Sequence, residues 1–134
     1  MKARVTEKIE QAHLIKLLRS VGGRVYVLGT RRRAEDFQGT MQTPGIGDVY
    51  ALLPAPPLRH EDGRPCSLWV EVKARGGRLR PEQAAFREQC LAAGVPHVVG
   101  GLDAVIAFLV DGGWLKANWV PHYRQPALAS RETR

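Results

Sequence analysis

The fold is decided by the stretch Leu68-Trp69-Val70-Glu71-Val72-Lys73. Its β-branched and aromatic residues are typical of a β-strand, and successive side chains of a strand point to opposite faces. Glu71 and Lys73 therefore share one face, whereas Val70 and Val72 share the other. A charged pair on a largely buried strand requires partners, because an isolated buried charge is costly. The stretch thus predicts an internal strand with a polar site on one face.

A partner for this charged pair precedes it in the chain. Gly45-Ile46-Gly47-Asp48 leads into a strand predicted over 47–53, so we expect Asp48 and Glu71 to meet at one edge of the sheet. The glycines either deliver Asp48 to a site and leave room for a ligand, or form only a strand-entry turn beside a solvated acid. Two carboxylates and one ammonium at a sheet edge would form a divalent-metal site suited to phosphodiester cleavage, because Mg²⁺ prefers oxygen ligands.

The chemistry of phosphodiester cleavage suggests roles for these residues. A catalyst must neutralise the phosphate, activate a water and stabilise the leaving oxygen. Asp48 and Glu71 are the candidate metal ligands, and the main-chain carbonyl of Val72 is an additional one. Lys73 would hold the attacking water or offset charge in the transition state.

Two helices offer further polar candidates. Gln83 shares a helical face with Phe86 and Cys90, so it either hydrogen-bonds near the charged strand or is a partly exposed residue at the start of its helix. Glu7 and Glu10 lie on the first helix, where one of them approaches the site or merely favours the helix dipole. Of these two acids we prefer Glu7. The candidate catalytic residues are therefore Asp48, Glu71, Lys73, Gln83 and Glu7.

The order of elements predicts an α/β protein with a central mixed sheet flanked by helices. The helix after the third strand allows a crossover to a parallel fourth strand. A length of 134 residues suggests a single domain. Trp114 and Trp119 follow the last helix and either pack on the body or form a contact surface. The predicted elements are a helix over 7–20, strands over 24–29, 47–53 and 67–74, a helix over 81–93, a strand over 95–99 and a helix over 102–110.

The charge of the chain favours a polyanionic partner. Lysine and arginine total 20 against 13 acids, which gives a net charge of +7. Two basic runs flank the acids and are candidate phosphate contacts, although such runs are often only solvated surface. These candidate DNA-binding residues are Arg31, Arg32, Arg33, Arg75, Arg78 and Arg80.

Other classes of protein are disfavoured. The two cysteines, Cys66 and Cys90, lack CxxC spacing and the four histidines are scattered, so we expect no His/Cys metal site. No apolar run approaches the roughly 20 residues that span a membrane, and the first residues lack the apolar stretch of a secretory signal. We therefore expect a cytoplasmic protein with no membrane partner.

Taken together, the motifs resemble the virus-type replication-repair nuclease (VRR-NUC) family of the PD-(D/E)XK nuclease superfamily. That family has an early helical Glu, then Gly-x-Pro-Asp, then Glu-x-Lys, then a Gln at the start of the next helix. The matching positions here are Glu7, Gly45 with Asp48, Glu71 with Lys73, and Gln83. One departure is Gly47, where the family usually has proline before the Asp, so the turn loses the fixed φ of proline.

The resemblance implies a restriction-endonuclease-like fold and Mg²⁺- or Mn²⁺-dependent DNA cleavage. It places the nuclease domain in residues 1–112 and leaves 113–134 as a C-terminal extension that includes a candidate dimer contact. Small members from phages and prophages resemble dimeric resolvases of four-way (Holliday) junctions. The resemblance thus implies a homodimer that acts in recombination or DNA repair, encoded by a phage or its bacterial host.

Two alternatives remain open from the sequence. One is a restriction-like or flap nuclease, which would differ in the DNA structure that it cuts. The other is a catalytically silent DNA-binding module of the same fold, which would bind DNA in a salt-sensitive manner without cutting it.

Overall fold

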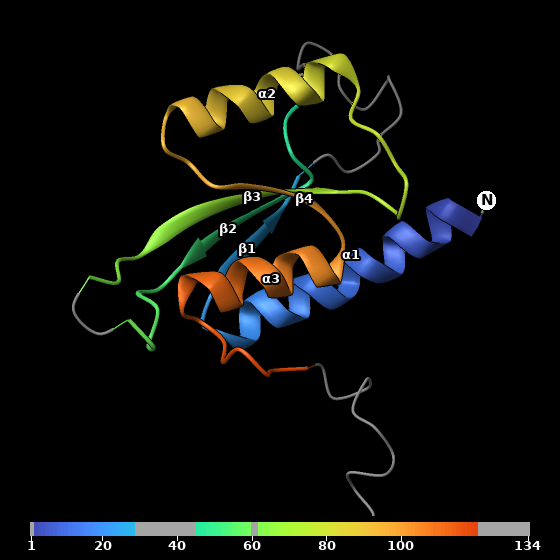
Figure 1. The fold of residues 1–134 in the computed structure, drawn as a ribbon. Coiled ribbons are helices and arrows are strands. Elements are labelled where there is room, and N and C mark those ends of the chain that lie inside the picture. The colour runs from blue at the N-terminus through green and yellow to red at the C-terminus, as the bar shows by residue number, and fades with distance from the viewer. Residues whose placement is uncertain (1, 29–44, 60–61, 121–134) are drawn as a thin grey trace, which may run out of the picture.

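The architecture is a four-stranded sheet with helices on both faces. The computed structural model describes residues 2–28, 45–59 and 62–120. Figure 1 shows α2 on one face of the sheet and α1 with α3 on the other. The elements are α1 (Lys2–Ser20), β1 (Arg24–Val27), β2 (Val49–Leu53), β3 (Cys66–Val72), α2 (Pro81–Ala92), β4 (His97–Gly100) and α3 (Leu102–Gly112).

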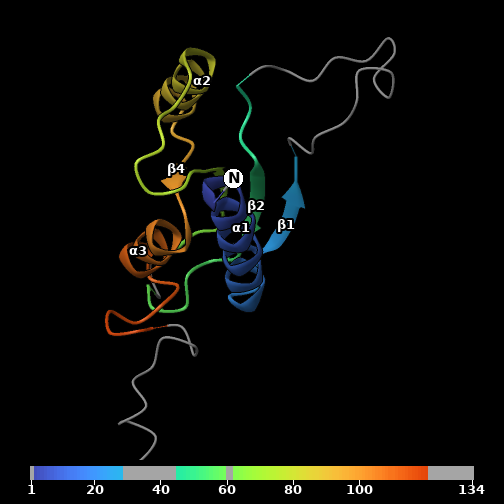
Figure 2. The ribbon, with the colours of Figure 1, turned by 90° about the vertical axis from the view of Figure 1, so that its right-hand side faces the viewer.

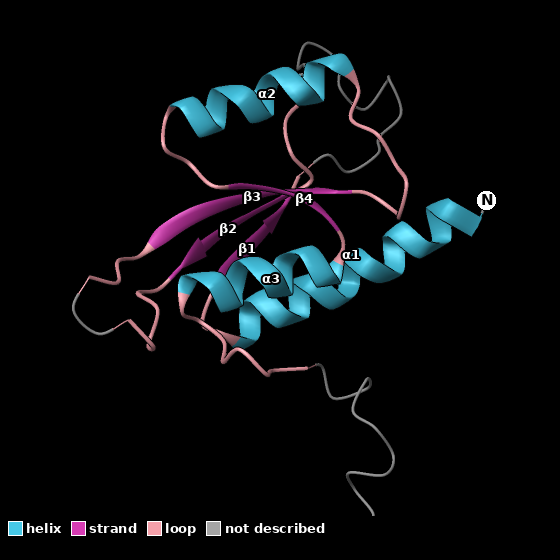
Figure 3. Cartoon of the chain, in the orientation of Figure 1, coloured by secondary structure: helices cyan, strands magenta, loops and turns pink. Residues whose placement is uncertain are grey.

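The sheet is mixed and its strands lie in the order in which they occur along the chain. β1, β2 and β3 are antiparallel neighbours, and β4 is parallel to β3. The parallel pair follows from the crossover through α2, which returns the chain to the end of the sheet at which β3 starts, so that β4 runs in the same direction (Figure 3). The α/β class, the mixed sheet and the predicted order of elements are confirmed.

The hydrophobic core lies between the sheet and the α1–α3 layer. Alternation along β3 buries Leu68, Val70 and Val72 on this side, against Leu14 and Leu18 of α1. Trp69 and Glu71 therefore belong to the opposite face, toward α2, as the alternation of the strand predicts. Figure 2 shows how the two helical layers stand on either side of the sheet.

Several element boundaries differ from the prediction by one or two residues, and the start of α1 differs by five. α1 begins at Lys2 instead of residue 7, because nothing in 2–6 interrupts a helix that starts with good helix-forming residues. β4 begins at His97 instead of residue 95. The N–H of Val95 bonds to the carbonyl of Cys90 at the end of α2 (2.8 Å), and Pro96 has no N–H to give to the sheet.

The chain continues to pack against the body after α3. Trp114 is 8% exposed, stacks on Phe108 and donates from Nε1 to the carbonyl of Pro54 (2.7 Å). Trp119 is partly buried against the same core. Of the two alternatives for Trp114, packing on the body is therefore the one observed. Among the described helices, none is long and apolar enough to cross a membrane.

Candidate active site

Asp48 is fixed at the point where β2 begins and β3 ends. Its N–H donates to the carbonyl of Val70 (3.0 Å), and its carboxylate Oδ2 accepts from the N–H of Val72 (2.8 Å). The N–H and C=O of one strand residue point to the same side, so the carbonyl of Val72 also faces Asp48. The structure thus brings Asp48 and Val72 together at the end of β3.

Glu71 lies beside Asp48 and is almost completely buried, with 3% exposure. Its Oε2 accepts from Nε2 of Gln83 (2.9 Å), whereas its Oε1 has no hydrogen-bond partner within the described chain. Burial, then the charge of Asp48 and a hydrogen bond to it, raise the pKa of Glu71 from 4.5 to about 8, against the opposing charges of Lys73 and Arg80. Burial and the neighbouring acid outweigh these two positive charges, so the pair favours retention of a proton.

Gln83 links the start of α2 to Glu71. It is 6% exposed, and its Oε1 accepts from the N–H of Arg80 (2.8 Å). Because this backbone N–H can only donate, the amide oxygen faces Arg80 and the NH₂ group faces Glu71. Gln83 is therefore a buried partner of the acid, not a partly exposed residue at a helix start. Cys90 is also buried, as predicted for this helical face.

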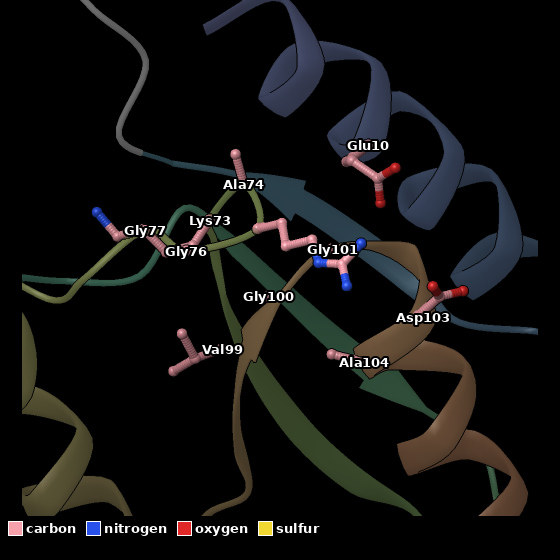
Figure 4. A pocket seen from close by; sticks show the side chains of 11 residues that line it. Glu10, Lys73, Ala74, Gly76, Gly77, Val99, Gly100, Gly101, Asp103 and Ala104 are labelled. Carbon is pink, nitrogen blue, oxygen red and sulfur yellow. The ribbon is translucent and has the colours of Figure 1, made fainter. Parts of the chain in front are cut away.

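Lys73 follows β3 directly and its N–H donates to the carbonyl of Gly100 (3.0 Å). Its side chain is half-buried and lines a pocket with a cavity volume of about 620 Å³. Figure 4 shows Glu10 and Asp103 projecting from α1 and α3 on one side of this pocket and Val99 on the other. The pocket is therefore an open space at the carboxyl ends of the parallel strands β3 and β4, and Lys73 is the candidate catalytic residue that lines it.

The two acids of α1 serve different segments. Oε2 of Glu7 accepts from the N–H of Ala74 (3.1 Å), directly after Lys73, whereas Oε1 of Glu10 accepts from the N–H of Leu102 (2.6 Å) at the start of α3. Glu7 is thus the acid that contacts the end of β3. In the part of the chain that the structure describes, no three His, Cys, Asp or Glu residues are grouped so as to hold a metal ion. Among the described residues, the centre of the site is therefore the pair of acids Asp48 and Glu71.

The predicted DNA-contacting arginines are found on exposed surface where the structure describes them. Arg75, Arg78 and Arg80 are exposed in the segment between β3 and α2. Arg80 forms an ion pair with Glu82 (3.4 Å). The other basic run, residues 31–33, lies outside the described residues.

Sequence reasoning missed the packing role of Gly45. Its φ is +86°, and a Cβ at this position would overlap the carbonyl oxygen of Glu82 and lie 3.1 Å from the nitrogen of Gln83. The turn before Asp48 therefore rests against the first turn of α2. Gly47 is close to Trp69 in the same way, since a Cβ there would lie 3.0 Å from its ring. Glycine before a strand was the only available signal.

We expect Gly45→Ala to destabilise the protein more than Gly94→Ala does. Gly94 also has a positive φ, +78°, but no atom lies within 4 Å of its Cβ position, so it reports only the backbone strain. The overlap at Gly45 involves backbone, which yields little, and should add about 1 to 3 kcal/mol. Urea denaturation of both variants measures the difference. Equal losses would show that the turn moves away from α2 without cost.

Comparison of the chain with protein-family models, with curated proteins and with solved structures finds no match. The chemical interpretation of the site accordingly depends on its own geometry.

Proposed function

We propose that this protein is a divalent-metal-dependent endonuclease that hydrolyses DNA phosphodiester bonds at the Asp48–Glu71–Lys73 site. The observation that carries the proposal is the adjacency of two carboxylates at the end of β3, one of which has a buried oxygen without a hydrogen-bond partner among the described residues. Lys73 follows directly after this strand, and the pocket that it lines provides space for a phosphate group.

The donor set fits a hard divalent cation. Asp48, Glu71 and the carbonyl of Val72 offer only oxygen atoms, which Mg²⁺ and Mn²⁺ prefer. Within the described residues Oε1 of Glu71 has no hydrogen-bond partner, and the pKa of this carboxyl is raised, so a cation held between the two acids would stabilise their charged forms. A bound cation would stabilise negative charge on the phosphate and lower the pKa of a coordinated water.

The protein residues have distinct roles in this proposal. Lys73 offsets the charge of the phosphate and holds the attacking water. Gln83 fixes the orientation of Glu71, and the N–H of Val72 fixes that of Asp48. Glu7 holds the backbone directly after Lys73. The exposed arginines between β3 and α2, namely Arg75, Arg78 and Arg80, contact neighbouring phosphates.

A PD-(D/E)XK fold of the VRR-NUC type is the finer classification that we propose. The element order, the parallel β3–β4 pair and the acids at the end of β3 support it. The net charge of +7 supports a nucleic acid as the partner. A homodimer that cuts opposed strands of a four-way junction is part of the same proposal, because closed twofold dimers are the commonest oligomers.

The direct test is incubation of the purified chain with labelled single-stranded, duplex, flap and four-way DNA in Mg²⁺ or Mn²⁺. We expect cleavage of branched DNA that chelation with EDTA abolishes, because the acid pair requires a cation to hold the phosphate. Cleavage of plain duplex alone would favour a restriction-like enzyme. Salt-sensitive binding with no cleavage in either metal would contradict the proposal and favour a silent DNA-binding module.

A further inference from the structure

Among the described elements, α2 alone covers the sheet face opposite α1 and α3, and it covers the β4 side. α2 packs near β4, and Figure 2 shows it above the β4 side of the sheet and away from β1. The strand register pairs Tyr26 of β1 with Tyr50 of β2, and Tyr50 with Trp69 of β3. Directly paired residues of neighbouring strands share a face. These three rings therefore cross the sheet on the face that α2 leaves partly open.

The rings of Tyr26, Tyr50 and Trp69 form a continuous row, here called the aromatic row. Their centroids lie 6.5 Å apart between Tyr26 and Tyr50 and 4.5 Å apart between Tyr50 and Trp69. At the α2 end the row is closed by Phe86, which meets Trp69 edge-on at 5.1 Å. At the other end Tyr26 is 49% exposed, while Tyr50 and Trp69 are half-buried. The row is thus accessible from the β1 edge of the sheet.

The aromatic row leads to the acid pair. Trp69 precedes Glu71 by two residues on the same face of β3, which corresponds to about 7 Å along a strand. Its ring also adjoins the backbone of Gly47, the neighbour of Asp48. A nucleic acid strand bound along the row would therefore place its next phosphate at the candidate active site.

We propose that the aromatic row is a stacking platform for unpaired bases of the nucleic acid that is cut at the acid pair. This inference rests on the proposed function and specifies its substrate class. The π-face of a base stacks on aromatic side chains only when the base is not stacked within a duplex. Among the branched substrates of the proposed function, those that carry unpaired nucleotides next to the cleaved bond, such as a flap or a gap, are accordingly preferred over a fully paired four-way junction.

Charge favours this occupant over a second copy of the chain. Arg24 is exposed two residues before Tyr26 on the same face of β1, where it can contact a phosphate. A second copy on this face would bring another net charge of +7 and a second Arg24 close to the first. A polyanion is attracted to the same surface, so the charge around the row complements a nucleic acid strand.

The test measures binding in EDTA, where no metal-dependent cleavage occurs. The probes are a fluorescein-labelled oligothymidylate of about 12 nucleotides and an abasic chain of the same length and charge. We expect the native protein to bind the oligothymidylate more tightly. Tyr26→Ala should weaken that binding about 5-fold or more and leave binding of the abasic chain unchanged. Tyr26→Phe keeps the ring and should bind both probes as the native protein does.

Equal affinity of the native protein for the two probes would overturn the inference, and this comparison needs no variant to fold. It would also be overturned if Tyr26→Ala weakened the binding of both probes equally. A native dimer in sedimentation that becomes a monomer in Tyr26→Ala would overturn it as well. Metal-dependent cleavage without base-dependent binding would leave the proposed function intact and remove only the stacking platform. Base-dependent binding without cleavage in any metal would support the stacking platform and contradict the proposed nuclease function.

Discussion

Lys73→Ala should lower the rate of DNA cleavage by about 10³-fold, because an ammonium placed where charge develops contributes most in the transition state. The fold should persist, since Lys73 is only half-buried and lies after the end of β3. Single-turnover cleavage of branched DNA in Mn²⁺ measures the rate, and circular dichroism measures folding.

The matched control for this variant is Lys16→Ala, which removes the same charge from an exposed position on α1. It should cut DNA at the native rate. Retention of cleavage within about tenfold of the native rate by a folded Lys73→Ala would contradict the role given to this residue. A comparable loss in both variants would instead attribute the effect to overall charge.

Glu71→Gln should abolish cleavage and, at the same time, stabilise the metal-free protein at alkaline pH. The pKa of Glu71 is raised from 4.5 to about 8, so between these values the folded protein holds a proton that the unfolded chain has released. The free energy of unfolding therefore falls as pH rises through this window, and the contribution of the neutral form is lost above it. The amide of Gln stays neutral at every pH, so its advantage over the native residue should grow from about pH 6 to about pH 9.

Urea denaturation in EDTA at these two pH values measures the effect of Glu71→Gln. Glu88→Gln, on an exposed position of α2, is the control and should show no such pH dependence. Adding Mn²⁺ should stabilise the native protein, and more so at the higher pH, because the cation replaces the shared proton. It should not stabilise Glu71→Gln to the same extent. If Glu71→Gln is less stable than the native protein at about pH 9, the folded protein does not raise the pKa of Glu71.

The sequence was sufficient where structure follows from local patterns. Alternation along Leu68 to Lys73 predicts which residues of β3 enter the core, and the crossover helix predicts the parallel β4. The meeting of Asp48 with Glu71 was predicted from two neighbouring strands, one of which begins at an acid while the other ends near one. Gln83 as their buried partner was one of two alternatives, and its burial decided between them.

Features that depend on tertiary packing were not accessible from the sequence. The sequence offers little to separate the roles of Glu7 and Glu10. Their hydrogen bonds to the N–H groups of Ala74 and Leu102 distinguish these roles. The core position of Trp114 depends on the carbonyl of Pro54, which lies far away in the chain. The need for glycine at residue 45 comes from the first turn of α2, which no local pattern reveals.

The two acids of α1 also make the rotation of that helix about its axis set the positions of two other segments. Glu7 and Glu10 are separated by less than one helical turn, yet they receive N–H groups from segments that are joined only through α2 and β4. One inserted residue between them would rotate one acid relative to the other by about 100°. Both attachments could then not be made at once, and the amides of Ala74 and Leu102 would exchange their hydrogens at different rates. The rotational phase of a single helix thus sets the alignment of two distant loop ends.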